Sequence, residues 1–320
     1  MTTEMRFGII GEGDDVLRAY QDLGAAQGAQ VTAVMAASAA VRRELGALLS
    51  TGIVETVEEV CADPQVQAVY IALSGGTREE AIRQSLAAGK HVLVAGPWDA
   101  PLAEGRELCA LAKEKGLAFG LSAPWAVSGA HLAVRTLTRA GLLGEILSWR
   151  DDLLRPQPMA DALRQALRPL DLFAWLTNLE PQEVYAQQAP SAEGIELYAV
   201  MVRYANGCIG GLQVGRGVPG GPGMHPQGMR IIGALGQFDM TDEPMVYRTR
   251  SSEDAPAHTW QRVRHTGLRG SRSEAMSQFA ASVARGQEPA LPAKVILGPL
   301  AILEAVQRSL AEGTPVPVTL

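Results

Sequence analysis

The stretch GKHVLVAGP at residues 89–97 decides the fold of this chain. Its centre, residues 91–95, is an apolar run of β-forming residues, and Gly96-Pro97 closes it. A strand that is buried on both faces of a parallel sheet has this pattern. Open α/β sheets bind ligands at the carboxyl ends of their strands, so we expect the functional site next to Gly96 and Pro97.

Short apolar runs alternate with helical patterns on both sides of this strand. The expected strands cover residues 6–10, 30–36, 66–73 and 117–121, and the expected helices cover 39–49, 57–62, 101–115 and the residues between Thr77 and Gly89. Strands that alternate with helices in this way lie parallel and are joined by right-handed crossovers. Residues 1–122 are therefore predicted to form an α/β domain with a Rossmann-type, doubly wound parallel sheet.

Residues 123–320 have a different pattern, in which strands predominate. The expected strands cover residues 145–152, 183–188, 195–204, 208–214, 229–234, 237–240, 245–249 and 259–264, and the expected helices cover 127–140, 161–177, 273–285 and 294–311. The turn Ala205-Asn206-Gly207 is typical of an antiparallel hairpin. This half is predicted to be an α+β domain with a mostly antiparallel sheet. The glycine-rich residues 215–228 are either an irregular hairpin tip or a flap over a ligand.

The composition narrows the class of partner. The chain has 320 residues, a net charge of −6 and no long run of one sign, which argues against nucleic acids and anionic membranes and favours a small soluble ligand. Its three cysteines are far apart and none forms a CxxC pair, so neither a disulfide framework nor a metal site is indicated. No run of eighteen apolar residues occurs, and we expect a cytoplasmic protein.

Several segments, in their order along the chain, resemble one known family. They are GIIGEG at 8–13, DPQVQAVYIAL at 63–73, AAGKHVLVAGP at 87–97, GLLGEIL at 141–147, PLDLFAWL at 169–176 and ILEAVQRSLAEGTPV at 302–316. This set resembles the glucose-fructose oxidoreductase, inositol dehydrogenase and MocA (Gfo/Idh/MocA) family. The resemblance implies hydride transfer between NAD or NADP and a sugar, polyol or related compound. It also implies a homo-oligomer, a dimer or tetramer, through an open face of the C-terminal sheet.

The resemblance also implies where the cofactor binds. Gly11 and Gly13 match the dinucleotide turn, but Val16 stands at the third glycine position and Asp14 and Asp15 lie within the loop. The other residues that we assign to the cofactor are Ser38, Arg42, Ser74, Gly96 and Pro97. No acid follows the second strand to bind the adenosine ribose. Arg42 and Arg43 nearby are suited to receive a 2′-phosphate, which favours NADP over NAD; the alternative is a helix with two solvated arginines.

The proton-transfer positions depart furthest from the family pattern. The family's Glu-Lys-Pro is Ala95-Gly96-Pro97 here, and Lys90 lies roughly 20 Å away at the other end of the strand. The positions of the family's aspartate and histidine hold Arg164 and Arg168, whose i, i+4 spacing places both side chains on one helical face as a clamp for a carboxylate or phosphate. The alternative is that both face solvent and pair with Asp161.

Two other residues are candidates for the substrate side. His131 remains as a candidate catalytic proton carrier, and Trp125 is a candidate substrate contact with core packing as its alternative. His91, which begins a buried strand, is expected to be a core histidine.

Three functions remain open at this point. The chain is an NAD(P)-dependent oxidoreductase with displaced catalytic groups, a catalytically silent protein that binds an anionic ligand, or a structural partner of an active paralogue.

Overall fold

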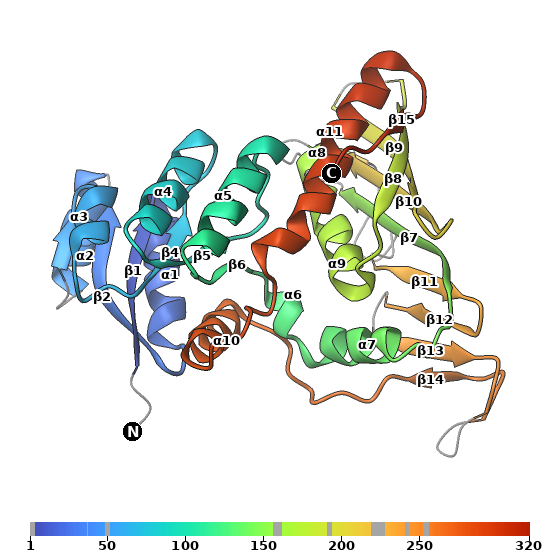
Figure 1. The fold of residues 1–320 in the computed structure, drawn as a ribbon, viewed down its shortest axis with the longest axis horizontal. Coiled ribbons are helices and arrows are strands. Elements are labelled where there is room, and N and C mark those ends of the chain that lie inside the picture. The colour runs from blue at the N-terminus through green and yellow to red at the C-terminus, as the bar shows by residue number, and fades with distance from the viewer. Residues whose placement is uncertain are drawn as a thin grey trace. The chain divides into compact units, whose positions relative to one another are not determined.

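The computed structural model describes residues 4–36, 38–48, 52–155, 162–190, 194–218, 228–240, 243–251 and 256–320. The chain divides into two compact units (Figure 1). The first consists of Met1–Ser128 with Arg269–Lys294, and the second of Gly129–Leu268 with Val295–Leu320. This division differs from the predicted boundary after residue 122, because residues 269–294 return to the first unit.

The first unit contains a six-stranded parallel sheet. Its strands are β1 (Met5–Gly11), β2 (Ala29–Ala36), β3 (Gly52–Val54), β4 (Ala68–Ala72), β5 (His91–Ala95) and β6 (Phe119–Ser122). They lie in the order β3-β2-β1-β4-β5-β6, and every pair is parallel. This is the strand order of a Rossmann-type sheet, so the predicted fold class is confirmed. Only β3 was missed, because three residues are too few to show a period.

Helices and a late segment of the chain complete this unit. The helices are α1 (Gly13–Gly24), α2 (Ala39–Leu48), α3 (Val57–Ala62), α4 (Gly76–Ala87), α5 (Leu102–Glu114), α6 (Pro124–Val127) and α10 (Arg272–Ala284). Although α10 comes late in the sequence, its Phe279 joins the core around Phe7 with 6.2 Å between ring centroids. The α10 residue Arg272 also pairs with Asp22 at 2.7 Å. Burial of this apolar helix face explains why the segment belongs to the first unit.

The second unit contains a nine-stranded sheet. Its strands are β7 (Ile146–Arg155), β8 (Pro181–Gln188), β9 (Glu196–Tyr204), β10 (Ile209–Arg216), β11 (Arg230–Gly233), β12 (Gly236–Asp239), β13 (Met245–Arg248), β14 (Trp260–Arg262) and β15 (Val316–Pro317). Among these strands only β7 and β10 pair in parallel. The predicted mostly antiparallel sheet and the β9–β10 hairpin are confirmed.

The helices of the second unit are α7 (Gly129–Arg139), α8 (Ala162–Gln165), α9 (Leu167–Thr177) and α11 (Leu297–Glu312). The prediction of one helix over residues 161–177 was wrong, because a tight turn at Ala166, whose N–H donates to Leu163 O, separates α8 from α9. None of the described helices of the chain is long and apolar enough to cross a membrane. Of the predicted 215–228 loop, Gly215 and Arg216 belong to β10, and residues 219–227 lie outside the described residues.

One face of the nine-stranded sheet exposes a row of apolar side chains. The register places Ile209 and Ile232 on either side of Ser148, and continues through Gln237 and Tyr247 to Trp260. The two isoleucines and the tryptophan are each 44–49% exposed, as large apolar groups rarely are. The sheet therefore has an open face with exposed apolar side chains, between which Ser148 and Gln237 lie.

Candidate functional site

The carboxyl edge of the six-stranded sheet holds the predicted dinucleotide turn. Gly11 ends β1, and a Cβ there would lie 2.9 Å from Val16 Cγ2 and 3.3 Å from Ala72 O. Gly13 begins α1 with φ at +53°, and a Cβ there would meet nothing within 4 Å. Gly11 is thus required for close packing, whereas Gly13 provides a left-handed turn that leaves open space beside it. This turn follows β1, at the point where the strand order reverses and such sheets bind ligands.

The first turn of α1 is suited to an anion despite its acidic residues. The N-cap residue Glu12 makes no capping hydrogen bond with its side chain. Asp14 and Asp15 are exposed, and Asp15 is directed along the helix to Arg18 at 3.6 Å. The first amide groups and the positive end of the helix dipole thus remain available to a phosphate.

Val16, at the third glycine position, is part of the core. Its side chain has no exposed surface and packs in the cluster between α1 and the sheet. The helix therefore lies against β1 with an apolar side chain, and the departure from the glycine pattern leaves the turn intact.

Arg42 belongs to the first turn of α2, and its guanidinium lies at the end of β2. Its Nη1 donates to Ala36 O at 2.9 Å, and its Nη2 lies 3.5 Å from Glu55 Oε1. The neighbouring Arg43 donates instead to Ala39 O within its own helix at 3.4 Å. Ser38 is exposed beside Arg42, whose backbone N–H donates to Ser38 O. A guanidinium is thus held where the adenosine ribose lies in sheets of this order.

The loops after β4, β5 and β6 contribute further predicted residues to the same edge. Ser74, Gly96 and Pro97 are exposed, and Trp125 is half-buried in α6. A Cβ on Gly96 would lie 3.6 Å from Ser122 O, which is an ordinary contact. The position therefore has room for a side chain but carries neither charge nor proton.

A buried ionic cluster supports the loop that follows β5. Arg78 donates to Glu79 Oε1 at 2.9 Å and to Pro97 O at 3.3 Å, and it also pairs with Asp99. Trp98 Nε1 donates to the same Glu79 oxygen at 3.0 Å. The Arg78 and Glu79 side chains are only 5% and 2% exposed. A satisfied network of this kind holds the first turn of α4 and the Pro97 loop in one arrangement.

Sequence analysis missed this cluster. Glu79 has the position of an ordinary first-turn acid in α4, and nothing local distinguishes it from the exposed Glu80. Its burial depends on Trp98 and Asp99, which the chain brings back from about twenty residues away.

The far end of β5 holds no group that faces this edge. Lys90 is buried, and its Nζ donates to Asp63 O at 2.8 Å and to Val66 O at 2.7 Å. His91 is half-buried, and its Nδ1 accepts from Ala118 N at 3.0 Å. The Lys90 ammonium thus donates to two backbone carbonyls at the end of β5 that is far from Gly96.

In the second unit, the charge of Arg168 acts both on His131 and on an acid that the sequence did not indicate, Asp151. Burial, with a smaller effect of Arg168, lowers the pKa of His131 to about 4. Burial also raises the pKa of Asp151 to about 6, although a Gly228 N–H and Arg168 both favour its charged form. His131 is therefore neutral at pH 7, and Asp151 titrates close to the range in which acid–base catalysis works.

The position of Asp151 follows from the alternation of β7. Trp149, Asp151 and Leu153 share the buried face, and Trp149 stacks on Phe173 of α9 at 4.8 Å. This period of two is visible in the sequence and places a carboxyl group among inward-facing residues.

The predicted arginine pair is divided between two helices. Arg164 is half-buried in α8, and Arg168 is exposed in the first turn of α9. Ala166 between the two helices keeps right-handed helical torsions, with φ −61° and ψ −24°, so the shared face of the pair stays a prediction. Asp161, their suggested partner, lies outside the described residues. Asp171 is fully buried, and this burial raises its pKa well above the ordinary range.

Comparison with known proteins agrees with this architecture. The GFO_IDH_MocA model, described as an oxidoreductase family with an NAD-binding Rossmann fold, matches residues 5–122. Residues 5–122 therefore match the NAD-binding Rossmann domain of the Gfo/Idh/MocA oxidoreductase family. The predicted family resemblance is thereby confirmed.

Two relatives of this protein have names that specify sugars. It is 28% identical over 217 residues to the 1,5-anhydro-D-fructose reductase of Ensifer adhaerens, which covers 60% of this chain and 61% of that one. It is 30% identical over 161 residues to a dTDP-3,4-didehydro-2,6-dideoxy-alpha-D-glucose 3-reductase of Streptomyces violaceoruber, which covers 50% and 47%. The matched segments thus span about half to three fifths of these relatives.

A solved structure extends the likeness of fold to both units. An oxidoreductase from Agrobacterium radiobacter, in complex with NAD+, L-tartaric acid and magnesium, matches 99% of each chain with a TM-score of 0.80 and 14% identity. At this identity the likeness concerns the fold.

The residues of this chain fit a dinucleotide at the carboxyl edge. The open space at Gly13 and the uncapped start of α1 suit a pyrophosphate, and the guanidinium of Arg42 lies at the end of β2. Among the predicted cofactor residues, the structure gathers Gly11, Gly13, Ser74, Gly96 and Pro97 at the carboxyl ends of β1, β4 and β5, with Ser38 and Arg42 after β2.

Proposed function

We propose that this chain is an NAD(P)-binding oxidoreductase-family protein that acts on, or binds, a small sugar-type, polyol-type or anionic ligand. The observation that carries the proposal is the turn after β1, where open space beside Gly13 adjoins the uncapped start of α1. The sugar-reductase names of both sequence relatives support the substrate class.

The proposed cofactor is NADP in preference to NAD. Arg42 supports this choice, because its guanidinium is held at the end of β2 and its present anionic partner is the exposed Glu55. A 2′-phosphate can replace such a carboxylate and accept two parallel hydrogen bonds. The nicotinamide, when bound, supplies or accepts the hydride.

We propose that proton transfer does not use the family's usual lysine. Gly96 has no side chain, and Lys90 donates to two backbone carbonyls. Asp151, whose pKa of about 6 suits it to take or give a proton, is the proposed replacement in the second unit. His131 is neutral at pH 7 and is suited to hydrogen bonding rather than to storing a proton.

A catalytically silent binding protein is the alternative function. The glycine at position 96 favours it, since the usual group for hydroxyl polarisation is missing there. In that case Arg164 and Arg168 would hold an anionic ligand without turnover.

We also propose assembly of copies through the open face of the nine-stranded sheet. The exposed strip of Ile209, Ile232 and Trp260 supports a homo-oligomer, or pairing with an active paralogue. Light scattering tests it: a dimer or tetramer is expected, and Ile209→Asp with Ile232→Asp should give monomers. A monomeric parent protein would contradict it.

Titration with NADPH and NADH, followed by fluorescence, tests the cofactor proposal. We expect NADPH to bind about tenfold more tightly than NADH, which corresponds to a well-placed charged hydrogen bond. Arg42→Ala should remove this preference, and the matched control Arg43→Ala should retain it. Absence of binding of either dinucleotide up to about 1 mM would overturn the proposal.

A further inference from the structure

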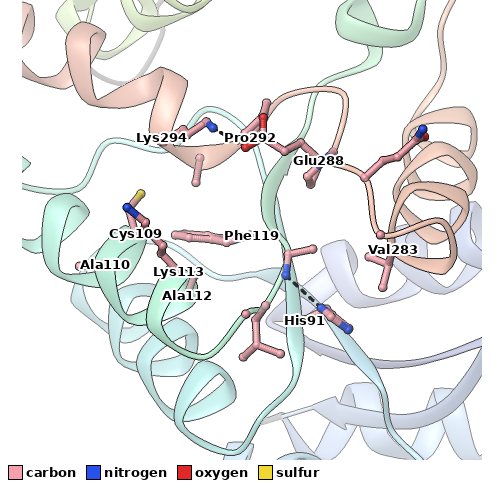
Figure 2. A pocket seen from close by; sticks show the side chains of 17 residues that line it. His91, Cys109, Ala110, Ala112, Lys113, Phe119, Val283, Glu288, Pro292 and Lys294 are labelled. Atoms are coloured by element: carbon pink, nitrogen blue, oxygen red, sulfur yellow. Dashed lines mark hydrogen bonds and ion pairs between the residues drawn. The ribbon is translucent and has the colours of Figure 1, made fainter.

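A second cavity lies at the opposite end of the six-stranded sheet from the dinucleotide turn. It has a volume of about 590 Å³ and is lined by residues of the first unit alone (Figure 2). His91 and Phe119, the first residues of β5 and β6, lie within it, whereas Gly96 follows the last residue of β5. Five strand residues, about 16 Å, therefore separate the cavity from the carboxyl edge.

The wall opposite α5 is held by specific contacts. Residues 286–293 follow α10, and a Cβ on Gly120 would lie 2.8 Å from Pro289 Cβ, so this loop packs directly on β6. Leu121 N donates to Leu291 O, and Ala290 N donates to Gln278 Oε1, each at 2.9 Å. The cavity is therefore preformed, as most small-molecule sites are.

The lining is mainly apolar. The α5 residues line one wall, Val283 stands on another side and Phe119 lies between them (Figure 2). Phe119 is fixed from behind by Trp98, whose ring is 5.2 Å away and meets it edge to face. A flat hydrocarbon body of one or two rings would bury its surface here.

The charges of the cavity favour a single negative group. Lys113 and Lys294 are the cations in the lining, and Glu288 is the one acid. Glu288 pairs with Lys294, whereas Lys113 makes no ion pair within the described residues. Burial lowers the pKa of His91, so the imidazole adds no positive charge at neutral pH.

The C-termini of two helices border the cavity. Their partial negative charge opposes an anion, but it does not reverse the preference for a negative ligand group. At the end of α5, the N–H groups of Gly116 and Leu117 donate to Lys113 O and Ala112 O. At the end of α10, those of Gly286 and Gln287 donate to Val283 O and Ser282 O. These carbonyls are satisfied by their own turns, so the side-chain charges decide the sign of the ligand.

We propose that this cavity is a binding site for a small amphipathic monoanion, a carboxylate on an aromatic or aliphatic body. The apolar body of the ligand would lie against Phe119, and its carboxylate would pair with Lys113 in the last turn of α5. This site is separate from the dinucleotide edge and does not depend on the proposed function.

Calorimetric titration with 2-naphthoate, 2-naphthamide and 2-naphthylmethylammonium tests the charge and the body of the ligand. One site is expected, with the carboxylate bound about fivefold more tightly than the amide, as for a partly exposed ion pair. The cation should bind more weakly than the amide. Lys113→Met should remove the difference between carboxylate and amide, and Lys115→Met, which lies outside the lining, should preserve it.

Occlusion and protection experiments locate the site. Ala110→Trp places an indole at the mouth of the cavity and should abolish naphthoate binding, whereas Ala103→Trp, two turns earlier on α5, should not. Bound naphthoate should slow alkylation of Cys109, which lines the cavity, and leave Cys61 in α3 unaffected.

Melting temperatures of all variants show whether each one is folded. Absence of naphthoate binding to the parent protein, preference for the cation, or binding that persists in folded Ala110→Trp would each overturn the proposal.

Discussion

The carboxyl edge of the sheet in the first unit and the residues His131, Asp151 and Arg168 of the second unit differ in the chemical groups that they offer to a ligand. The edge consists mainly of backbone: the turn at Gly11 and Gly13, the amides of α1 and the loops after β4 and β5. The group in the second unit consists of ionisable side chains: burial shifts the pKa values of His131 and Asp151, and the charge of Arg168 acts on both.

This difference teaches how a family site changes. A backbone site tolerates Val16 at a glycine position, because the valine packs inward and the turn keeps its shape. A side-chain site is expected to have no such tolerance: if Gly96 and Arg168 stand where the family resemblance implies a lysine and a histidine, these exchanges change the chemistry itself. We therefore expect dinucleotide binding to be retained more readily than the usual proton transfer.

The largest expected effect is on the free energy of unfolding. It tests whether the loops at the carboxyl edge depend on the buried ionic cluster of Arg78, Glu79 and Asp99. Arg78→Met leaves the carboxylates of Glu79 and Asp99 without their cation, which should cost about 3–5 kcal/mol of unfolding free energy. Denaturant unfolding measures this loss. Arg83→Met, on the same helix in an exposed network, should cost less than about 1 kcal/mol. Equal losses in both variants would remove the special role of the buried cluster.

The next prediction restores the glycine pattern of the turn. Val16→Gly deletes a fully buried side chain and adds a helical glycine, which should cost about 3 kcal/mol. NADPH affinity should remain within about twofold, because the turn already has its shape. Arg18→Gly, an exposed site on the same helix, controls for the glycine and should cost about 1 kcal/mol. A large gain in affinity would show that Val16 obstructs the cofactor.

A third prediction concerns the charge of Asp151. Its folded-state pKa of about 6 lies above the ordinary 3.8, so its favourable contribution is present below pH 4 and is lost as pH rises through 6. Asp151→Asn should therefore stabilise the protein at pH 8 by on the order of 2 kcal/mol and change little at pH 4.

Thermal unfolding at both pH values measures this effect. Asp152→Asn is the matched control, because it removes an ion pair to Arg150 at 2.8 Å and should give no stabilisation at pH 8. If Asp151→Asn destabilised the protein at pH 8, the carboxylate would be favourable in its charged form and the proposed proton-carrying role would fail.

The smallest expected effect restores the missing lysine. Gly96→Lys has room for its side chain and should raise NADP-dependent oxidation of at least one member of a sugar and polyol panel about tenfold, less than a complete acid–base group provides. Gly76→Lys places the same charge at the start of α4 and should have no such effect. Unchanged oxidation rates in Gly96→Lys would show that the lack of a lysine side chain at position 96 does not limit the rate.

Sequence reasoning predicted the elements far better than the groups that interact within the site. The strand at 91–95 follows from a local pattern, and it is present. The anion clamp at Arg164 and Arg168 stays a prediction, because these residues belong to two helices, α8 and α9, that meet at Ala166. Arg78 and Asp151 were missed because their importance comes from partners that lie far away in the sequence.

By itself, the sequence determined the alternation of strands and helices, the glycine turn and the absence of a lysine at position 96, because periodicity and residue identity are local properties. Only the tertiary structure decided which charges are buried. Burial depends on segments that meet from distant parts of the chain, such as Asp99 on Arg78 and Phe173 beside Trp149. The same is true of the cavity beside Phe119, which exists only because residues 286–293 return to β6.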